Sequence, residues 1–260
     1  MMLFSRTLSF LYIVDHETML SLWYMPPLGF FAAIVANCVP IGGGVVYIPA
    51  LYYLGENMEL GVAFTVATMS LGSGFISPLK WLSVDKDLII WTAIPFTVLP
   101  AWKGFIVSMA FPSLGEDAER LFFGIFCLAL AVFVAAIARA GGAMEFSRQL
   151  SSFTPHKSMS TAVYWGLTAF VSFLAGLILI PNIGIGPALT TFICLSLHGG
   201  IDTHAALVTG IVVGGWASWV PLAIHLLFSR DVPILHWIMV MPGVFLGAQV
   251  GLYVTDPTCV

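Results

Sequence analysis

The chain has 260 residues and a net charge of −4, with 59% hydrophobic and only 8% charged residues. Soluble domains carry roughly 25% charged residues, so this composition indicates an integral membrane protein. Apolar residues do not alternate with polar ones along the chain, which excludes a regular β-barrel. Helices are then the way to hydrogen-bond the backbone N–H and C=O groups in lipid. The chain has no cluster of basic residues, so nucleic-acid binding is excluded as well.

Apolar stretches long enough to enter or cross a bilayer follow one another along the chain. They are expected at 22–55, 60–82, 88–111, 120–138, 160–198, 205–228 and 233–254. About 20 residues cross a hydrocarbon core of ~30 Å, so the first and fifth stretches are too long for one span. We therefore predict an all-α integral membrane protein with about seven apolar segments, two of which break or fold back.

Both long stretches carry Gly/Pro breaks near their middles, "PIGGG" at 40–44 and "PNIGIGP" at 181–187. An offset of about 142 residues aligns these breaks and the segments after them, which indicates two related halves. If each broken stretch enters and leaves the membrane on the same side, the odd number of further spans in a complete repeat places the second half upside down with respect to the first. If each broken stretch crosses the membrane once, the two halves have the same orientation. We predict inverted repeats, each opening with a Gly/Pro-broken helical hairpin.

Charged loops predict the orientation of the spans. The basic residues Lys80 and Lys86 share one loop, and Arg139, Arg148 and Lys157 lie in the central connection, so both loops are expected in the cytoplasm. The acidic loops "GENMEL" and "PSLGEDAE" then lie on the opposite side. The predicted organisation is a lead-in at 1–21, a first membrane repeat at 22–138, a cytoplasmic connection at 139–158 and a second membrane repeat at 159–260.

The second repeat has no counterpart of the stretch 120–138. The alternatives are a truncated product or a face that is covered by another copy of the chain or by a partner subunit.

The two breaks predict an anion site near the middle of the membrane. A helix that restarts after a glycine run has free N–H groups and the positive end of its dipole at its first turn, and glycine allows an anion to approach closely. The candidate binding residues are Gly42, Gly43, Gly44, Gly184 and Gly186. The alternative is that these glycines only permit close helix packing, but their occurrence at matched positions favours the site.

Polar residues inside the apolar stretches add candidates. Asn37 and Asn182 flank the breaks and could cap freed backbone groups or donate to an anion. Lys103 lies well inside the stretch 88–111, where it either faces the cavity as a cation or reaches the membrane surface with its long side chain. His225 could take up protons in a coupled cycle, although a histidine near a helix end is more often an interface residue.

The segments "VPIGGGVVYIPAL" and "ATMSLGSG", with "IPNIGIGPALTTFI" and "HAALVTG", resemble the two half-motifs of the TauE/SafE sulfite exporter family. The resemblance spans roughly residues 25–254 and implies transport of sulfite or organosulfonates across the cell membrane. The chain departs from the family pattern at Ile185, which replaces the middle glycine, and in the hydroxyl pairs, of which Thr68 and Thr209 remain as candidate donors.

These observations predict a secondary transporter, and an exporter in direction, for a small sulfur oxyanion bound between the two breaks in the lipid bilayer. A passive anion channel and a non-transporting membrane subunit are the alternatives. An intramembrane hydrolase built on Ser73 is disfavoured because no protease or G-x-S-x-G signature surrounds it. No cofactor is expected, and no metal either, since His198, Asp202 and His204 fit a loop at the membrane surface.

Overall fold

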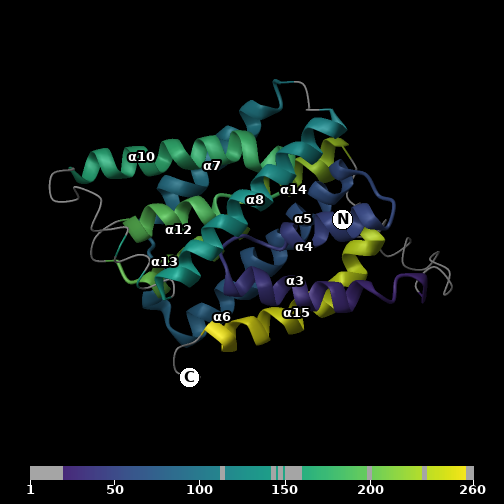
Figure 1. Cartoon of the computed structure of the whole chain (residues 1–260), viewed down its shortest axis with the longest axis horizontal. Coiled ribbons are helices and arrows are strands. Elements are labelled where there is room, and N and C mark those ends of the chain that lie inside the picture. Colours follow the sequence, from purple (N-terminus) through teal and green to yellow (C-terminus); the bar gives the residue numbers. More distant parts are fainter. Residues whose placement is uncertain are drawn as a thin grey trace.

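The computed structural model describes residues 20–111, 115–141, 145, 149, 160–197, 201–229 and 233–255. Over these residues the chain folds into a bundle of helices without strands (Figure 1). Five helical stretches are long and apolar enough to cross a membrane, and shorter apolar helices accompany them. The prediction of an all-α integral, multi-pass membrane protein is therefore confirmed.

The first half of the chain opens with a broken hairpin and continues with three longer helical stretches. Its helices are α3 (Met25–Cys38), α4 (Gly44–Tyr53), α5 (Met58–Leu71), the π-helical η1 (Gly72–Ile76), α6 (Ser77–Val84), the 3₁₀ turn η2 (Lys86–Leu88), α7 (Ala93–Ser108) and α8 (Glu116–Ala140). Elements α5, η1 and α6 form one continuous stretch.

The second half repeats this order as far as the counterpart of α7. Its helices are α10 (Thr161–Leu174), the π-helical η4 (Ala175–Leu179), α11 (Ile180–Ile183), α12 (Ala188–Leu197), α13 (Thr203–Ala217), α14 (Trp219–Ile224), the π-helical η5 (His225–Ser229) and α15 (Ile234–Thr255). The predicted breaks fall between α3 and α4 and between α11 and α12. Each contains a left-handed residue, Gly42 (φ 80°) and Gly184 (φ 61°), a conformation that glycine adopts without strain.

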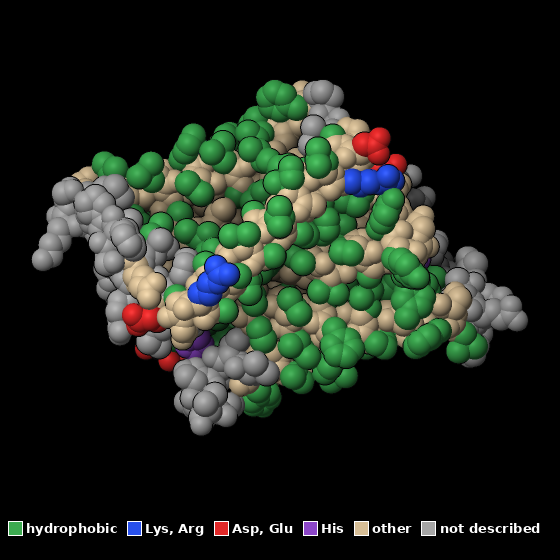
Figure 2. All heavy atoms as spheres, in the orientation of Figure 1, with side chains coloured by type: hydrophobic (Ala, Val, Ile, Leu, Met, Phe, Trp, Pro, Cys, Tyr) green, Lys and Arg blue, Asp and Glu red, His purple; other side chains and the backbone are tan. Residues whose placement is uncertain are grey.

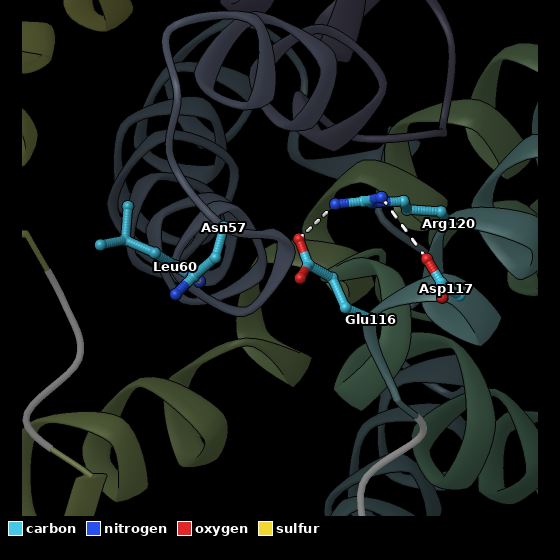
Figure 3. A network of polar contacts seen from close by, with 5 residues as sticks. All are labelled: Asn57, Leu60, Glu116, Asp117 and Arg120. Atoms are coloured by element: carbon cyan, nitrogen blue, oxygen red, sulfur yellow. Dashed lines mark hydrogen bonds and ion pairs between the residues drawn. The ribbon is translucent and has the colours of Figure 1, made fainter.

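Short polar caps start the long helices at the ends of the bundle. The Asn57 side chain accepts a hydrogen bond from the Leu60 N–H at the start of α5, and Asp202 does the same for Ala205 in α13. Helix α8 begins with acidic residues, which favour its positive N-terminal dipole. Arg120 pairs there with Glu116 and with Asp117 (Figure 3).

The two acidic loops share one end of the bundle. The guanidinium group of Arg120 lies 4.8 Å from the ring centre of Tyr52, so the end of α4 meets the start of α8. Figure 3 shows this end of the bundle, with Asn57 at the start of α5 and Glu116 at the start of α8. We call this end the Arg120 end.

The basic loop with Lys80 lies at the other end. Lys80 Nζ donates to Gln249 Oε1 over 2.9 Å and lies 4.8 Å from the ring centre of Tyr253, and Trp81 packs edge-on against His204 with ring centres 5.4 Å apart. The end of α6 therefore meets the start of α13 and the end of α15. We call this the Lys80 end; Arg148 and Lys157 of the predicted cytoplasmic side fall outside the described residues.

Corresponding elements of the two halves run in opposite directions. The stretch from α5 to α6 runs towards the Lys80 end, whereas α13 starts there. Helix α3 lies alongside α15, and both helices end at the Lys80 end. Its counterpart α10 starts at the Lys80 end, because it begins beside the first turns of α7, where Phe96 stacks on Trp165 with ring centres 5.2 Å apart. Opposite directions are what inverted halves require, while the internal repeat itself stays a prediction.

Glycines bring helices of different halves into backbone contact. Three glycines one turn apart on α15 lie against α3, Gly243 against Pro26, Gly247 against Phe30 and Gly251 against Ile34. Between α7 and the second half, Gly104 lies against the Phe173 carbonyl and Gly176 against that of Ala101. Small residues at this spacing are typical of close helix packing in membranes.

Helix α8 lies on the outside of the bundle. Leu121, Ile125, Leu128 and Val132 are more than half exposed, and Leu130 is the one residue of α8 that is buried. Figure 2 shows hydrophobic side chains over the middle of this face, with acidic and basic side chains towards its edges. This distribution fits a surface that faces lipid along its length and water at its ends.

Candidate functional site

The two helix breaks meet in the middle of the bundle. A Cβ at Gly44 would lie 3.1 Å from Ile185 Cγ1 and 3.3 Å from the Ile183 carbonyl oxygen. Ile41, Ile183 and Ile185 are buried together there, and Leu130 of α8 covers them. The junction between the breaks is therefore apolar and closed, with Ile185 filling it.

A small cavity lies beside the first break, at the N-terminus of α4. Its volume is about 20 Å³. A water molecule needs about 10–15 Å³ and benzene fits a cavity of about 150 Å³, so in this conformation the cavity has room for little more than a water molecule. Small, polar and aliphatic residues of α3, α4, α5, η1 and α15 line it: Ala32, Ala33, Ala36, Asn37, Gly43, Tyr47, Thr68, Met69, Gly72, Ser73, Val244 and Ala248.

Three of the residues predicted from the sequence line this cavity: Asn37, Gly43 and Thr68. The Asn37 amide donates to the Ala33 carbonyl over 2.8 Å, and its oxygen accepts from the Ser77 hydroxyl over 2.7 Å. Asn37 therefore links α3 to α6 beside the cavity, and the second N–H of its amide remains for a ligand. The Thr68 hydroxyl donates to the Phe64 carbonyl over 2.7 Å, so its oxygen is left to accept.

Two hydroxyl groups at the cavity were not predicted as binding residues. Tyr47 is 1% exposed and Ser73 is 5% exposed, and both side chains line the cavity. Tyr47 lies one turn after Gly43 on the same face of α4, so helical periodicity counted from the glycine run could have found it. Ser73 lies in η1, a π-helical segment of the kind that often marks functional sites.

The other predicted glycines lie at the breaks and outside the cavity. A Cβ at Gly42 would lie 2.6 Å from Met69 Sδ, and one at Gly184 would lie 3.0 Å from the Val62 carbonyl oxygen. Gly186 faces the backbone of Gly214 at 3.1 Å. These contacts support the packing alternative for Gly42, Gly184 and Gly186.

The polar residues predicted in the second half also lie elsewhere. Thr209 accepts a hydrogen bond from the Ile90 N–H over 2.9 Å and so holds the loop after η2 against α13. Asn182 donates to the Ile178 carbonyl over 2.6 Å within its own helical stretch. His225 packs on the Phe105 ring with centres 6.4 Å apart and does not line the cavity.

Lys103 lies on the exposed face of α7, outside the cavity. Its position fits a side chain that reaches the membrane surface along the lipid face. We expect Lys103→Met to leave the KM for the transported anion unchanged, and uptake by proteoliposomes over a range of substrate concentrations measures it. A raised KM would instead support the binding role predicted from the sequence.

The residues of the second half that correspond to the cavity lining are less polar. At an offset of 142 residues, the positions of Asn37, Gly43 and Tyr47 are occupied by Leu179, Ile185 and Leu189. In the alignment of residues 67–74 with 208–215, Thr68 corresponds to Thr209 and Ser73 to Gly214. The first turn after the second break also contains Pro187, which has no N–H to donate. Asn37, Tyr47 and Ser73 therefore have no polar counterpart at these positions of the second half.

Searches of curated proteins and of solved structures found no match to the chain. A family model, that of the sulfite exporter TauE/SafE, matches residues 26–257, from the second residue of α3 to beyond the end of α15. The match includes both helix breaks and all the residues that line the cavity. The chain therefore belongs to the sulfite exporter TauE/SafE family.

Proposed function

We propose that this protein is a secondary transporter that exports a small sulfur oxyanion, such as sulfite or an organosulfonate, across the cell membrane. The family gives the general function, transport of a sulfur anion through a membrane. The observation that carries the finer proposal is the cavity at the first helix break, where Asn37, Tyr47 and Ser73 line a small space together with Gly43, the residue before α4.

The first turn of α4 suits an anion for two physical reasons. The N–H groups that open a helix have no carbonyl partner within it, and the aligned peptide dipoles place partial positive charge there. Gly43, the residue before α4, lines the cavity, and the Tyr47 ring lies where a side chain of Gly43 would be. Tyr47 and Ser73 add hydroxyl donors from two different elements.

An anion enters this cavity only after part of its wall moves, because an oxyanion of four or more heavy atoms exceeds the present volume. Helix α15 of the second half contributes Val244 and Ala248, while the remaining lining residues come from the first half. Movement of α15 with respect to α4 and α5 would therefore widen the cavity. Movement of one half against the other around a fixed site is the usual basis of alternating access.

Counterflow of radiolabelled sulfite in proteoliposomes tests the proposal. We expect saturable uptake that is accelerated by unlabelled sulfite inside the vesicles. Ser73→Ala should raise the KM for sulfite several-fold because it removes a hydrogen-bond donor. A neutral hydrogen bond contributes about 1 kcal/mol to the binding free energy. The matched control is Ser83→Ala at an exposed serine of α6, which should behave like the wild type.

Two results would count against the proposal. Flux that neither saturates nor shows counterflow would indicate a passive anion pore, and no flux with any sulfur anion would indicate a non-transporting subunit. A hydrolase is not supported by the site, because no histidine lines the cavity to act as a base for Ser73.

A further inference from the structure

The cavity wall contains no charged side chain. On the elements that line the cavity and on α6, the charged groups and histidines are Glu59, Lys80 and His236. At 1.5 Å per residue, Lys80 lies about 10 Å along its helical stretch from Ser73, Glu59 about 13 Å from Thr68, and His236 about 12 Å from Val244. Lys80 is in addition engaged with Gln249 and Tyr253.

All the donors that face the cavity are therefore neutral. They are the hydroxyls of Tyr47 and Ser73, one N–H of Asn37, and the backbone N–H groups at the start of α4. The helix end contributes only about half a positive charge, and its effect falls off within one turn. This set can balance one negative charge and lacks the cation that a second charge requires.

The cost of dehydrating an anion depends steeply on its charge. In the Born description it rises with the square of the charge, so a dianion costs about four times as much as a monoanion of equal size. Apolar groups close the neighbouring junction between the breaks, where Ile41, Ile183 and Ile185 are at most 4% exposed. Bulk water is therefore excluded from that side of the cavity.

We propose that the cavity selects singly charged oxyanions, namely hydrogensulfite and monoanionic organosulfonates, and rejects dianions such as SO₃²⁻ and sulfate. This inference rests on the proposed transport function and narrows its substrate class. The selection comes from charge and not from shape, because sulfate and a small sulfonate have similar tetrahedral ends.

Competition in the counterflow assay tests the inference. An excess of methanesulfonate, which carries one charge at every pH used, should suppress sulfite counterflow, whereas the same concentration of sulfate should leave it unchanged. Equal suppression by sulfate would overturn the inference while leaving the transport function intact. Absence of flux with any sulfur anion would instead overturn the transport function, and the inference with it.

The pH dependence of the KM provides a second arm. Above the second pKa of sulfite, the fraction of hydrogensulfite falls about tenfold per pH unit, so the KM for total sulfite should rise in the same proportion. The KM for methanesulfonate should not change over this range, which separates titration of the substrate from titration of the protein. A parallel rise in both KM values would assign the effect to a protein group and contradict the inference.

A cation added to the wall should admit dianions. Met69 lines the cavity and has a long flexible side chain, so Met69→Lys places an ammonium group there with little change in length. We expect sulfate to compete with sulfite in this variant and not in the matched variant Met69→Leu. If sulfate competes in neither variant although both transport sulfite, charge is not the selective factor. If the lysine variant does not insert, the competition and pH arms still decide the question.

Discussion

Replacement of Gly43 by leucine should abolish sulfite counterflow while the protein still inserts into the membrane. A Cβ at Gly43 would lie 2.5 Å from the Tyr47 ring, and the rest of a leucine side chain would occupy a cavity of about 20 Å³. The substitution therefore removes the space for the anion beside the α4 N-terminus. Radiolabelled sulfite flux, normalised to the amount of protein in the vesicles, measures the effect.

Gly124→Leu provides the matched control for this variant. Gly124 lies in α8, and a Cβ there meets nothing within 4 Å, so the same change should leave both flux and insertion unchanged. Normal flux in Gly43→Leu would show that the anion does not bind at this break. Loss of flux in both variants would point to a general effect of leucine on the bundle.

Replacement of Gly247 by valine should destabilise the whole protein. A Cβ at Gly247 would overlap the Phe30 carbonyl oxygen and lie 2.9 Å from Phe30 Cα, so α15 must move away from α3. Overpacking of this kind costs about 1–3 kcal/mol, and more where backbone atoms clash. Thermal unfolding in detergent, followed by circular dichroism, should show a lowered Tm.

Gly166→Val is the control for the packing prediction. Gly166 lies on α10, where an added Cβ meets nothing within 4 Å, so its Tm should stay close to that of the wild type. An unchanged Tm in Gly247→Val would mean that the contact between α3 and α15 contributes little to stability.

The spans and breaks of this fold are readable from the sequence for simple physical reasons. A helix in lipid needs an uninterrupted apolar stretch of fixed length, and Gly or Pro within such a stretch is rare enough to predict where the helix stops. Both breaks lie within the segments predicted from the sequence, 40–44 and 181–187, and Gly42 and Gly184 in them both have the left-handed conformation. The acidic loops also share one end of the bundle, as the loop charges predict.

The composition of the cavity was only partly readable. Asn37 and Thr68 are polar in an apolar stretch, which draws attention to them, but Tyr47 reads as one more aromatic residue of the bundle. Thr209 shows the opposite error, because a hydroxyl in a helix can face a ligand or a neighbouring backbone, and here it accepts a hydrogen bond from the Ile90 N–H. Such choices depend on helix rotation, which composition does not determine.

Helix pairing was not predicted either. The glycine spacing at Gly243, Gly247 and Gly251 indicates a close helix contact but does not identify the partner. The structure shows that the partner is α3, from the other half of the chain. The same applies to Gly104, whose partner is the second half's opening helix.

The contact between α3 and α15 also has a consequence for biosynthesis. Among the described helices, α3 is made first and α15 is made last, and Met25–Cys38 packs on Ile234–Thr255. Helix α3 therefore meets this neighbour only after α15 has been made. Until then the face of α3 that packs on α15 contacts lipid or the insertion machinery. The contact between α3 and α15 therefore forms only after α15 has been made, and a chain that stops before α15 would expose an unfinished bundle to membrane quality control.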